Sequence, residues 1–318
     1  MNIVVTGSVA FDYIMKFPGR FTDHILPDRL EHISLSFLVD EMRKVYGGCA
    51  PNIAYSLALL GERPRLMATA GLDGGEYVRW LQENGVDVSL TKVCEDCFTA
   101  SFFVSTDLDQ NQIASFYTGA MARASELSFC DVDPRPDVAI IAPNDPAAMR
   151  RYARECRELE IAYIYDPSQQ VARVDGEELI AGLTGAQILI MNDYEYGILQ
   201  KKTGLSQSQL LERVAIIIIT RGEKGTDIVT REEIFQIPIA KPYAVLEPTG
   251  VGDAFRAGLL KGLACGFSWP LTGRIAALAA AYVIEYPGPQ PKSYTMGEFA
   301  ARYKENFGDA AELKELEN

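Results

Sequence analysis

The sequence predicts an α/β fold of three layers, in which helices cover both faces of a mainly parallel central sheet and a small β-sheet forms a lid. Short apolar, β-branched runs alternate with segments of helical periodicity, the pattern of parallel strands joined by crossover helices. The run Ile216–Ile219 is apolar at every position, as strands buried on both faces are. Two segments, 13–46 and 98–121, interrupt the alternation and are expected to form the lid.

The expected elements follow one another without a linker or an internal repeat, so one domain spanning residues 1–318 is predicted. The strands are Ile3–Thr6, Arg65–Ala70, Val138–Ala142, Tyr163–Tyr165, Ile188–Met191 and Ala215–Thr220, followed by a hairpin of Thr226–Thr230 and Ile234–Ile239. The helices are Asn52–Leu60, Glu76–Asn84, Pro146–Glu158, Gly176–Leu183, Asp193–Leu199, Gln207–Glu212, Asp253–Ala264, Leu271–Ile284 and Met296–Asn306.

The lid prediction depends on a hairpin pattern. Ser101–Thr106 and Ile113–Tyr117 flank a polar turn, while 13–46 is rich in Phe, Pro and charge and has no long helical period. Together the two segments are expected to form a small antiparallel sheet over one face of the domain. Such a sheet can close an active site, extend an edge or pair with a second copy, so a monomer and a lid-mediated homodimer both remain open.

Composition excludes several function classes. The net charge of −13 argues against non-specific nucleic-acid binding, which needs a basic surface. No apolar run reaches the ~18 residues that span a membrane, and the N-terminus lacks the features of a signal peptide, so a cytoplasmic protein is expected. With only two histidines and one C-x-x-C pair, neither a Ser-His-Asp site nor a metal cluster is well supported. General base chemistry would then need a carboxylate.

The most informative stretch is Glu247–Gly258. Gly250 and Gly252 permit a tight turn directly before a helix, and free N–H groups at a helix N-terminus form an anion site. Asp253 lies on the first turn of that helix, where an acid beside a phosphate is suited to take a proton from an attacking hydroxyl. The alternative is that Asp253 only complements its own helix dipole.

Two further turns near the N-terminus offer substrate contacts. Gly47 and Gly48 open a helix and allow a ligand to approach the backbone, and Asn52 carries both a donor and an acceptor. Asp12 follows the first strand, and ligands of open parallel sheets bind beyond the carboxyl ends of strands. Asp12 is therefore placed to accept hydrogen bonds from substrate hydroxyls. The alternatives are that the two glycines only mark the start of the helix and that Asp12 is an ordinary turn aspartate.

Two motifs after later strands suit a nucleotide. Asn192 can cap a helix while Glu195 holds a hydrated Mg²⁺, although Asn followed three residues later by Glu is also a capping box. Thr220, Gly222 and Gly225 suit contact with nucleotide phosphates. This segment is not a Walker A loop, and no G-x-G-x-x-G follows the first strand, so a dehydrogenase is not supported.

In this order, the motifs resemble the signatures of the ribokinase-like (PfkB) family of carbohydrate and nucleoside kinases, over nearly the whole chain. Its first signature is similar to Gly47–Gly61 and its second to Glu247–Asp253. The stretch Thr106–Met121 is similar to bacterial and archaeal adenosine and nucleoside kinases. Glu247 stands where the family usually has Asp, and the family's G-D-D-x-x-G turn is one residue short at Gly71–Gly75.

The resemblance implies transfer of the γ-phosphate of ATP to the 5′-hydroxyl of a ribonucleoside, with adenosine favoured. Asp253 would be the base, and the transferring phosphoryl group would bind the N–H groups of Gly250, Val251 and Gly252. Ribose or sugar hydroxyls would bind Asp12, Gly47, Gly48 and Asn52. Lid side chains would pack on a base, among them Phe37, Phe103, Phe116 and Met121.

The resemblance also implies the cofactors ATP and Mg²⁺, while a monovalent cation is left open. Mg²⁺ and phosphate would be organised by Asn192 and Glu195, the latter through water, and ATP would lie along Thr220, Gly222 and Gly225. The alternatives are a kinase for a free sugar such as ribose or fructose and, in another class, a binding protein without catalysis. The intact Gly250, Gly252 and Asp253 weigh against the latter.

Overall fold

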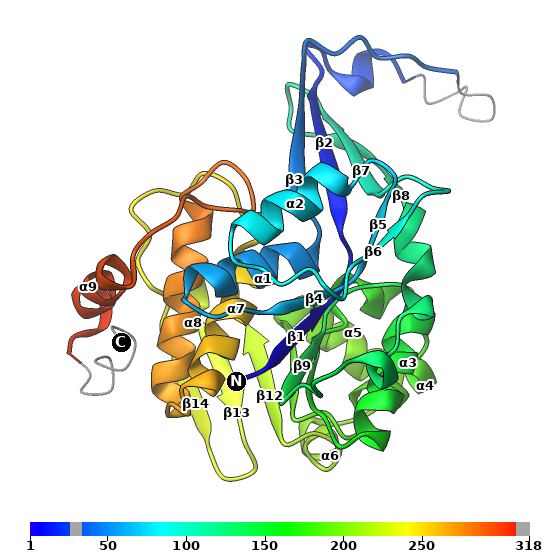
Figure 1. Ribbon diagram of the computed structural model, residues 1–318. Helices are drawn as coiled ribbons and strands as arrows, with labels where there is room; N and C mark the ends of the chain where they lie inside the picture. The colour runs from blue at the N-terminus through cyan, green and yellow to red at the C-terminus, as the bar shows by residue number, and fades with distance from the viewer. Residues whose placement is uncertain (26–33, 310–318) are drawn as a thin grey trace.

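The computed structural model describes residues 1–25 and 34–309, so the middle of the first predicted lid segment lies outside the described residues. Its main sheet has eight strands in the order β14-β13-β12-β11-β10-β9-β1-β4 (Figure 1). The strands are β1 (Ile3–Thr6), β4 (Arg65–Met67), β9 (Val138–Ile141), β10 (Ala162–Tyr165), β11 (Ile188–Asn192), β12 (Ile216–Thr220), β13 (Thr226–Val229) and β14 (Ile234–Ile237). Within this sheet, the neighbours β4, β1, β9, β10, β11 and β12 pair in parallel, and β13 and β14 close one edge as an antiparallel hairpin.

Helices cover both faces of this sheet, which confirms the three layers. They are α1 (Cys49–Leu59), α2 (Gly75–Glu83), α3 (Pro146–Glu158), α4 (Gly176–Leu183), α5 (Asp193–Thr203), α6 (Gln207–Leu211), α7 (Val251–Ala264), α8 (Trp269–Ile284) and α9 (Met296–Phe307). Successive strand residues point to opposite faces. Ile218 packs in the core formed with α1, α7 and α8, while Ile217 and Ile219 pack in the core formed with α3, α4 and α5. The apolar run therefore serves two cores.

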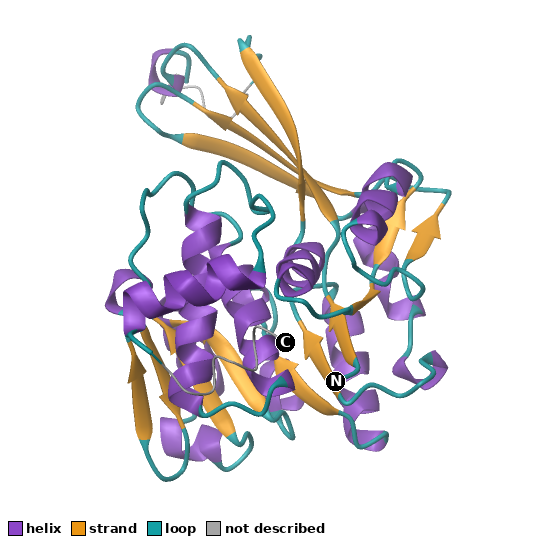
Figure 2. Cartoon of the chain, turned by 60° about the vertical axis from the view of Figure 1, so that its left-hand side comes forward, coloured by secondary structure: helices purple, strands orange, loops and turns teal. Residues whose placement is uncertain are grey.

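The lid is a separate four-stranded sheet in the order β3-β2-β7-β8, which extends beyond the body of the molecule (Figures 1 and 2). Its strands are β2 (Ala10–Lys16), β3 (Glu41–Gly47), β7 (Ala100–Thr106) and β8 (Gln112–Tyr117). The expectation of a purely antiparallel lid was wrong, because the central pair β2–β7 is parallel. Both strands leave the body in the same direction, and each returns through its own antiparallel neighbour, β3 or β8.

One predicted strand divides in two. Residues 65–70 form β4 in the main sheet and then, from Thr69 to Gly71, the strand β5, which pairs with β6 (Lys92–Cys94). The short turn after β5 closes through the Gly74 N–H, which donates to the Gly71 carbonyl at 2.9 Å. The Asp73 carboxylate accepts from the Thr99 N–H at 2.7 Å, which ties this turn to the start of the lid strand β7. Among the described residues, no helix is long and apolar enough to cross a membrane.

Candidate active site

The N-terminus of α7 has the geometry of an anion site. Gly250 adopts φ 80°, and a Cβ there would lie 2.6 Å from the Cβ of Pro289, so only glycine fits the turn. The Ala254 N–H donates to the Gly250 carbonyl at 2.9 Å, and the Gly252 N–H therefore precedes the first intrahelical bond. The Val251 N–H was expected to bind the transferring phosphoryl group, whereas in the structure it donates to the Pro248 carbonyl at 3.3 Å.

Asp253 lies on the first turn of α7, and its carboxylate accepts a hydrogen bond from Asn52 Nδ2 at 2.9 Å. Burial raises the pKa of Asp253 to about 7, against the opposing effects of the Arg256 charge and the Asn52 hydrogen bond. A carboxyl group with a pKa near neutral is partly ionised at physiological pH and binds a proton more tightly than an ordinary aspartate. Asp253 can therefore act as a general base.

Asp12 stands on the lid strand β2, opposite Val45 of β3. Burial raises the pKa of Asp12 to about 6, and the nearby charge of Glu247 adds to the effect. A Cβ at Gly47 would lie 2.5 Å from Asp12 Oδ2, so a larger residue there would displace the carboxylate. Gly48 adopts φ 92°, and a Cβ there would meet the Ser8 carbonyl at 2.4 Å. Gly48 is therefore required by its backbone conformation and close packing, while Gly47 leaves room for the Asp12 carboxylate.

One cavity of about 1150 Å³ brings the predicted residues together between the lid and the carboxyl ends of the central strands. This volume is slightly above the usual range of about 300–1,000 Å³ for ligand pockets and suits two small molecules side by side. The predicted residues that line it are Asp12, Gly48, Asn52, Phe116, Met121, Asn192, Glu195, Thr220, Gly222, Gly225, Gly250, Val251, Gly252 and Asp253. Gly47 is not among the lining residues and supports Asp12 from behind.

The capping box at the start of α5 is formed. Glu195 Oε2 accepts from the Asn192 N–H at 2.9 Å, and Asn192 Oδ1 accepts from the Glu195 N–H at 2.8 Å. The other carboxylate oxygen, Oε1, accepts from the Ser168 hydroxyl at 3.2 Å. No group of three His, Cys, Asp or Glu in the described part of the chain could hold a metal directly. A single carboxylate at the edge of a cavity fits a hydrated Mg²⁺ that also binds phosphate oxygens.

The turn after β12 is tight enough to require its glycines. Gly222 and Gly225 adopt φ 54° and 85°, and a Cβ at Gly225 would lie 2.2 Å from the Ile237 carbonyl. The Arg221 N–H donates to the Gly225 carbonyl at 2.8 Å and closes the turn. Thr220, the last residue of β12, thus faces the cavity beside a fixed backbone.

The predicted lid segment 98–121 contributes three large apolar side chains to the cavity: Phe102 and Phe116 from β7 and β8, and Met121 from the 3-10 helix that follows β8. Phe102 was not predicted, and Phe103 was predicted in its place. Neighbouring strand residues point to opposite faces, and Phe103 instead stacks on Tyr13 with ring centroids 4.7 Å apart. Phe37 does not line the cavity either, because it packs edge-to-face on the ring of Phe21 at 4.9 Å.

Sequence reasoning also missed a buried ion pair below the anion site. Arg256, one turn after Gly252, donates to both carboxylate oxygens of Asp166 at the end of β10. Its Nη1 donates to the Gly252 carbonyl at 2.8 Å. Arg256 is 6% exposed and Asp166 is 1% exposed, so the pair is buried at the edge of the cavity, which Arg256 also lines. An arginine among the small apolar residues of α7 was the only signal for it in the sequence.

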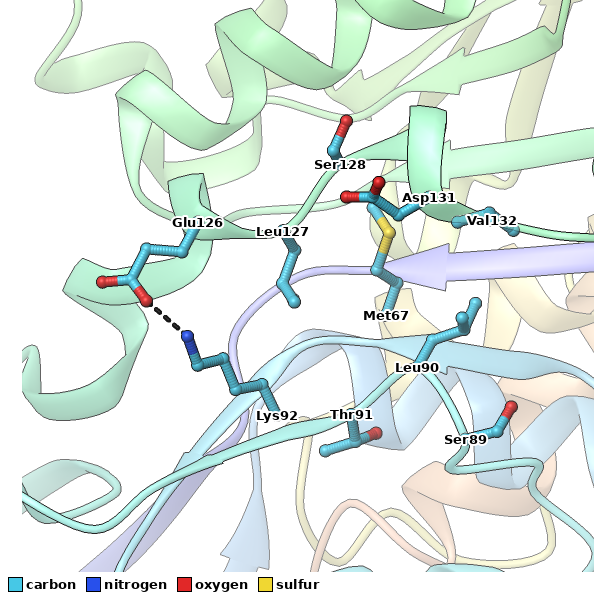
Figure 3. A pocket seen from close by; sticks show the side chains of 10 residues that line it. All are labelled: Met67, Ser89, Leu90, Thr91, Lys92, Glu126, Leu127, Ser128, Asp131 and Val132. Carbon is cyan, nitrogen blue, oxygen red and sulfur yellow. Dashed lines mark hydrogen bonds and ion pairs between the residues drawn. The ribbon is translucent and has the colours of Figure 1, made fainter.

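A smaller pocket of about 240 Å³ lies elsewhere, between the β6 strand and the segment 126–132 (Figure 3). It contains an exposed ion pair in which Lys92 Nζ lies 2.6 Å from Glu126 Oε2. None of the predicted site residues lines it. The predicted site residues therefore have no part in this smaller pocket.

Comparison with known proteins agrees with this geometry. Residues 3–296 match the pfkB family of carbohydrate kinases. The chain is 29% identical over 310 residues to the nucleoside kinase of Methanocaldococcus jannaschii, covering 96% of this chain and 97% of that protein.

Solved structures of a Burkholderia thailandensis nucleoside kinase are similar throughout. The structure in complex with inosine has a TM-score of 0.87 and 39% identity, covering 96% of this chain and 98% of that one. The structure in complex with ADP-inosine has a TM-score of 0.84 and 40% identity, covering 96% of each chain.

Proposed function

The chain belongs to the pfkB family of carbohydrate kinases, and we propose that its acceptor is the 5′-hydroxyl of a purine ribonucleoside, with adenosine as the leading candidate. As a member of this family, it is a phosphotransferase that acts on a hydroxyl group of a nucleoside or a sugar. The family implies ATP as the phosphoryl donor and usually Mg²⁺. The product from adenosine would be AMP.

One observation carries the proposal: a single cavity joins the helix N-terminus and its carboxylate to the apolar lid residues Phe102, Phe116 and Met121. A nucleoside has a flat apolar base that can pack on such side chains, and a hydroxyl that can reach the carboxylate. A free sugar would leave these lid side chains without a partner. The complex of the Burkholderia thailandensis relative with inosine, a purine nucleoside, supports the same class of acceptor.

The proposed transfer uses Asp253 as the base. The 5′-oxygen attacks the γ-phosphorus, the bond from that phosphorus to the bridging oxygen of ADP breaks, and the hydroxyl proton passes to the Asp253 carboxylate. The charge on the transferring group is stabilised at the start of α7, where the Gly252 N–H and the helix dipole converge. Most of the catalysis then comes from positioning and charge stabilisation.

The remaining predicted residues hold the two substrates in this proposal. Asp12, Asn52 and the Gly48 backbone would bind ribose hydroxyls, and the turn from Thr220 to Gly225 would lie along ATP. Mg²⁺ would bind through water to Glu195, beside Asn192, and would neutralise charge on the phosphates.

The test is an ATP-consumption assay with Mg²⁺ across adenosine, inosine, cytidine, ribose, fructose and fructose 6-phosphate. We expect kcat/KM for adenosine to exceed that for every sugar by about 10²-fold, or about 2.7 kcal/mol of transition-state binding. A sugar that matches or exceeds adenosine would contradict the nucleoside proposal. Separately, Asp253→Asn should lower turnover by about 10²-fold or more while ATP still binds, and retained turnover would remove Asp253 as the base.

A further inference from the structure

Gln290, in the loop that follows α8, contacts the candidate site from behind. Its Nε2 donates to Asn52 Oδ1 at 3.2 Å and to the Tyr77 hydroxyl at 2.6 Å. None of the motifs described above includes this residue. Its two hydrogen bonds lead to two different parts of the cavity.

The first hydrogen bond determines which end of the Asn52 amide faces Asp253. An asparagine side chain presents an acceptor on one side and a donor on the other. Because Gln290 donates to Oδ1, the Nδ2 group of Asn52 is directed at the Asp253 carboxylate, 2.9 Å away. A reversed amide would place an oxygen against that carboxylate, and the pKa of Asp253 would then rise further.

The second hydrogen bond supports the turn that holds Asp12. Tyr77 is fully buried, and its hydroxyl accepts from Gln290 and donates to the Gly47 carbonyl at 3.0 Å. Gly47 is the residue against which the Asp12 carboxylate rests. The same amide nitrogen thus supports the base on one side and the acceptor-binding turn on the other.

We propose that Gln290 is a positioning residue that sets the orientation of Asn52, and through it the ionisation of Asp253, while a second bond through Tyr77 fixes the Gly47 turn. The inference rests on the proposed function, in which Asp253 is the base. The loop itself is held independently, since the Tyr55 hydroxyl donates to the Pro291 carbonyl at 2.9 Å and Pro289 packs against Gly250. Changing the Gln290 side chain should therefore leave the loop in place.

The experiment measures kcat/KM for adenosine against pH in variants of similar size. Gln290→Met removes the donor, and Gln290→Glu replaces it with an acceptor. Loss of a net hydrogen bond, worth about 1 kcal/mol, corresponds to about 0.7 of a pKa unit at about 1.4 kcal/mol per unit. The acidic limb of the pH profile, where kcat/KM falls because Asp253 becomes protonated, should therefore move to higher pH by about half to one unit in Gln290→Met. It should move further in Gln290→Glu, because the carboxylate favours the reversed Asn52 amide.

Three controls separate positioning from packing. Gln187→Met, an exposed residue at the other end of β11, should not move the acidic limb. Tyr77→Phe removes the hydroxyl's bonds to Gln290 and to the Gly47 carbonyl but leaves the Gln290–Asn52 bond, so it should raise KM for the nucleoside without moving the acidic limb. In an Asn52→Leu background, Gln290→Met should add no further shift. Thermal unfolding of each variant establishes that it is folded.

The outcomes distinguish the two proposals. An unmoved limb in folded Gln290→Met and Gln290→Glu, or an undiminished shift in the Asn52→Leu background, would overturn the positioning role alone. An active Asp253→Asn enzyme would overturn the proposed base itself, whatever the Gln290 variants do.

Discussion

Replacing Asp253 by asparagine should make the protein more stable above neutral pH while it lowers turnover by about 10²-fold or more. Burial raises the pKa of this carboxyl group from 3.8 to about 7. The folded state therefore binds the Asp253 proton more tightly than the unfolded state does. This contribution to stability is complete below about pH 4 and is lost as pH rises through about 7. The asparagine side chain of the variant has no titrating proton, so the variant avoids the loss.

The size of the effect follows from the pKa difference. About 3 units at about 1.4 kcal/mol per unit give an upper limit of about 4 kcal/mol above pH 7. The residue is partly exposed to the cavity, and water there screens part of the cost of the charge. We therefore expect Asp253→Asn to exceed the natural protein in unfolding free energy by about 2 kcal/mol at pH 8. The advantage should shrink steadily towards pH 4.

Urea unfolding at several pH values between 5 and 8 measures this difference. Asp193→Asn is a matched control, because Asp193 also lies on the first turn of a helix but is exposed. Its variant should show a difference of no more than about 0.5 kcal/mol, without the same rise with pH. The reasoning would be refuted if the gain in unfolding free energy of Asp253→Asn were equal at all pH values or absent at pH 8. Either result would mean that ionisation of the buried Asp253 does not destabilise the folded protein.

The other predictions concern residues around the same cavity. Arg256→Met should destabilise the protein by about 3–5 kcal/mol in urea unfolding, because it leaves the Asp166 carboxylate buried and unpaired; a loss below about 1 kcal/mol would contradict this. Gly250→Ala, at φ 80° and against Pro289, should cost at least about 1 kcal/mol of stability and lower kcat more than it changes KM. Asp12→Asn should raise KM for the nucleoside about tenfold while KM for ATP stays constant in steady-state assays. Phe116→Ala should weaken nucleoside binding about tenfold in calorimetry and leave ribose unaffected.

Local signals in the sequence were sufficient for most of the fold. The bounds of β1, α3 and α4 agree with the predicted ranges, because apolar periodicity, Pro146 and the caps before these helices act over a few residues. The divided strand at residues 65–70 was not predictable in this way. The change from β4 to β5 depends on pairing with β6, which lies more than twenty residues further along the chain.

The cavity was predictable for a related reason. Its residues follow the ends of parallel strands or begin helices, and the topology of the fold collects those positions at one edge of the sheet. The supporting contacts were not predictable, because Gln290 and Asn52 are 238 residues apart and Arg256 and Asp166 are 90 apart. Neither pair has a spacing that a motif would mark. The direction of Phe102 and Phe103 also depended on the register of the lid, which a single strand does not set.

The proposed function requires an acidic chain to bind a polyanion, ATP, in a cavity that several carboxylates line. Asp12 and Asp253, which line the cavity, and the buried Asp166 are each neutralised in part. Asp166 is paired with the buried Arg256, and burial raises the pKa of Asp12 to about 6 and of Asp253 to about 7. The positive end of α7 and its Gly252 N–H then act on a site where these three carboxylates oppose an anion less than three free carboxylates would. The raised pKa values that make Asp253 a suitable base thus also lower the repulsion that an incoming phosphate meets.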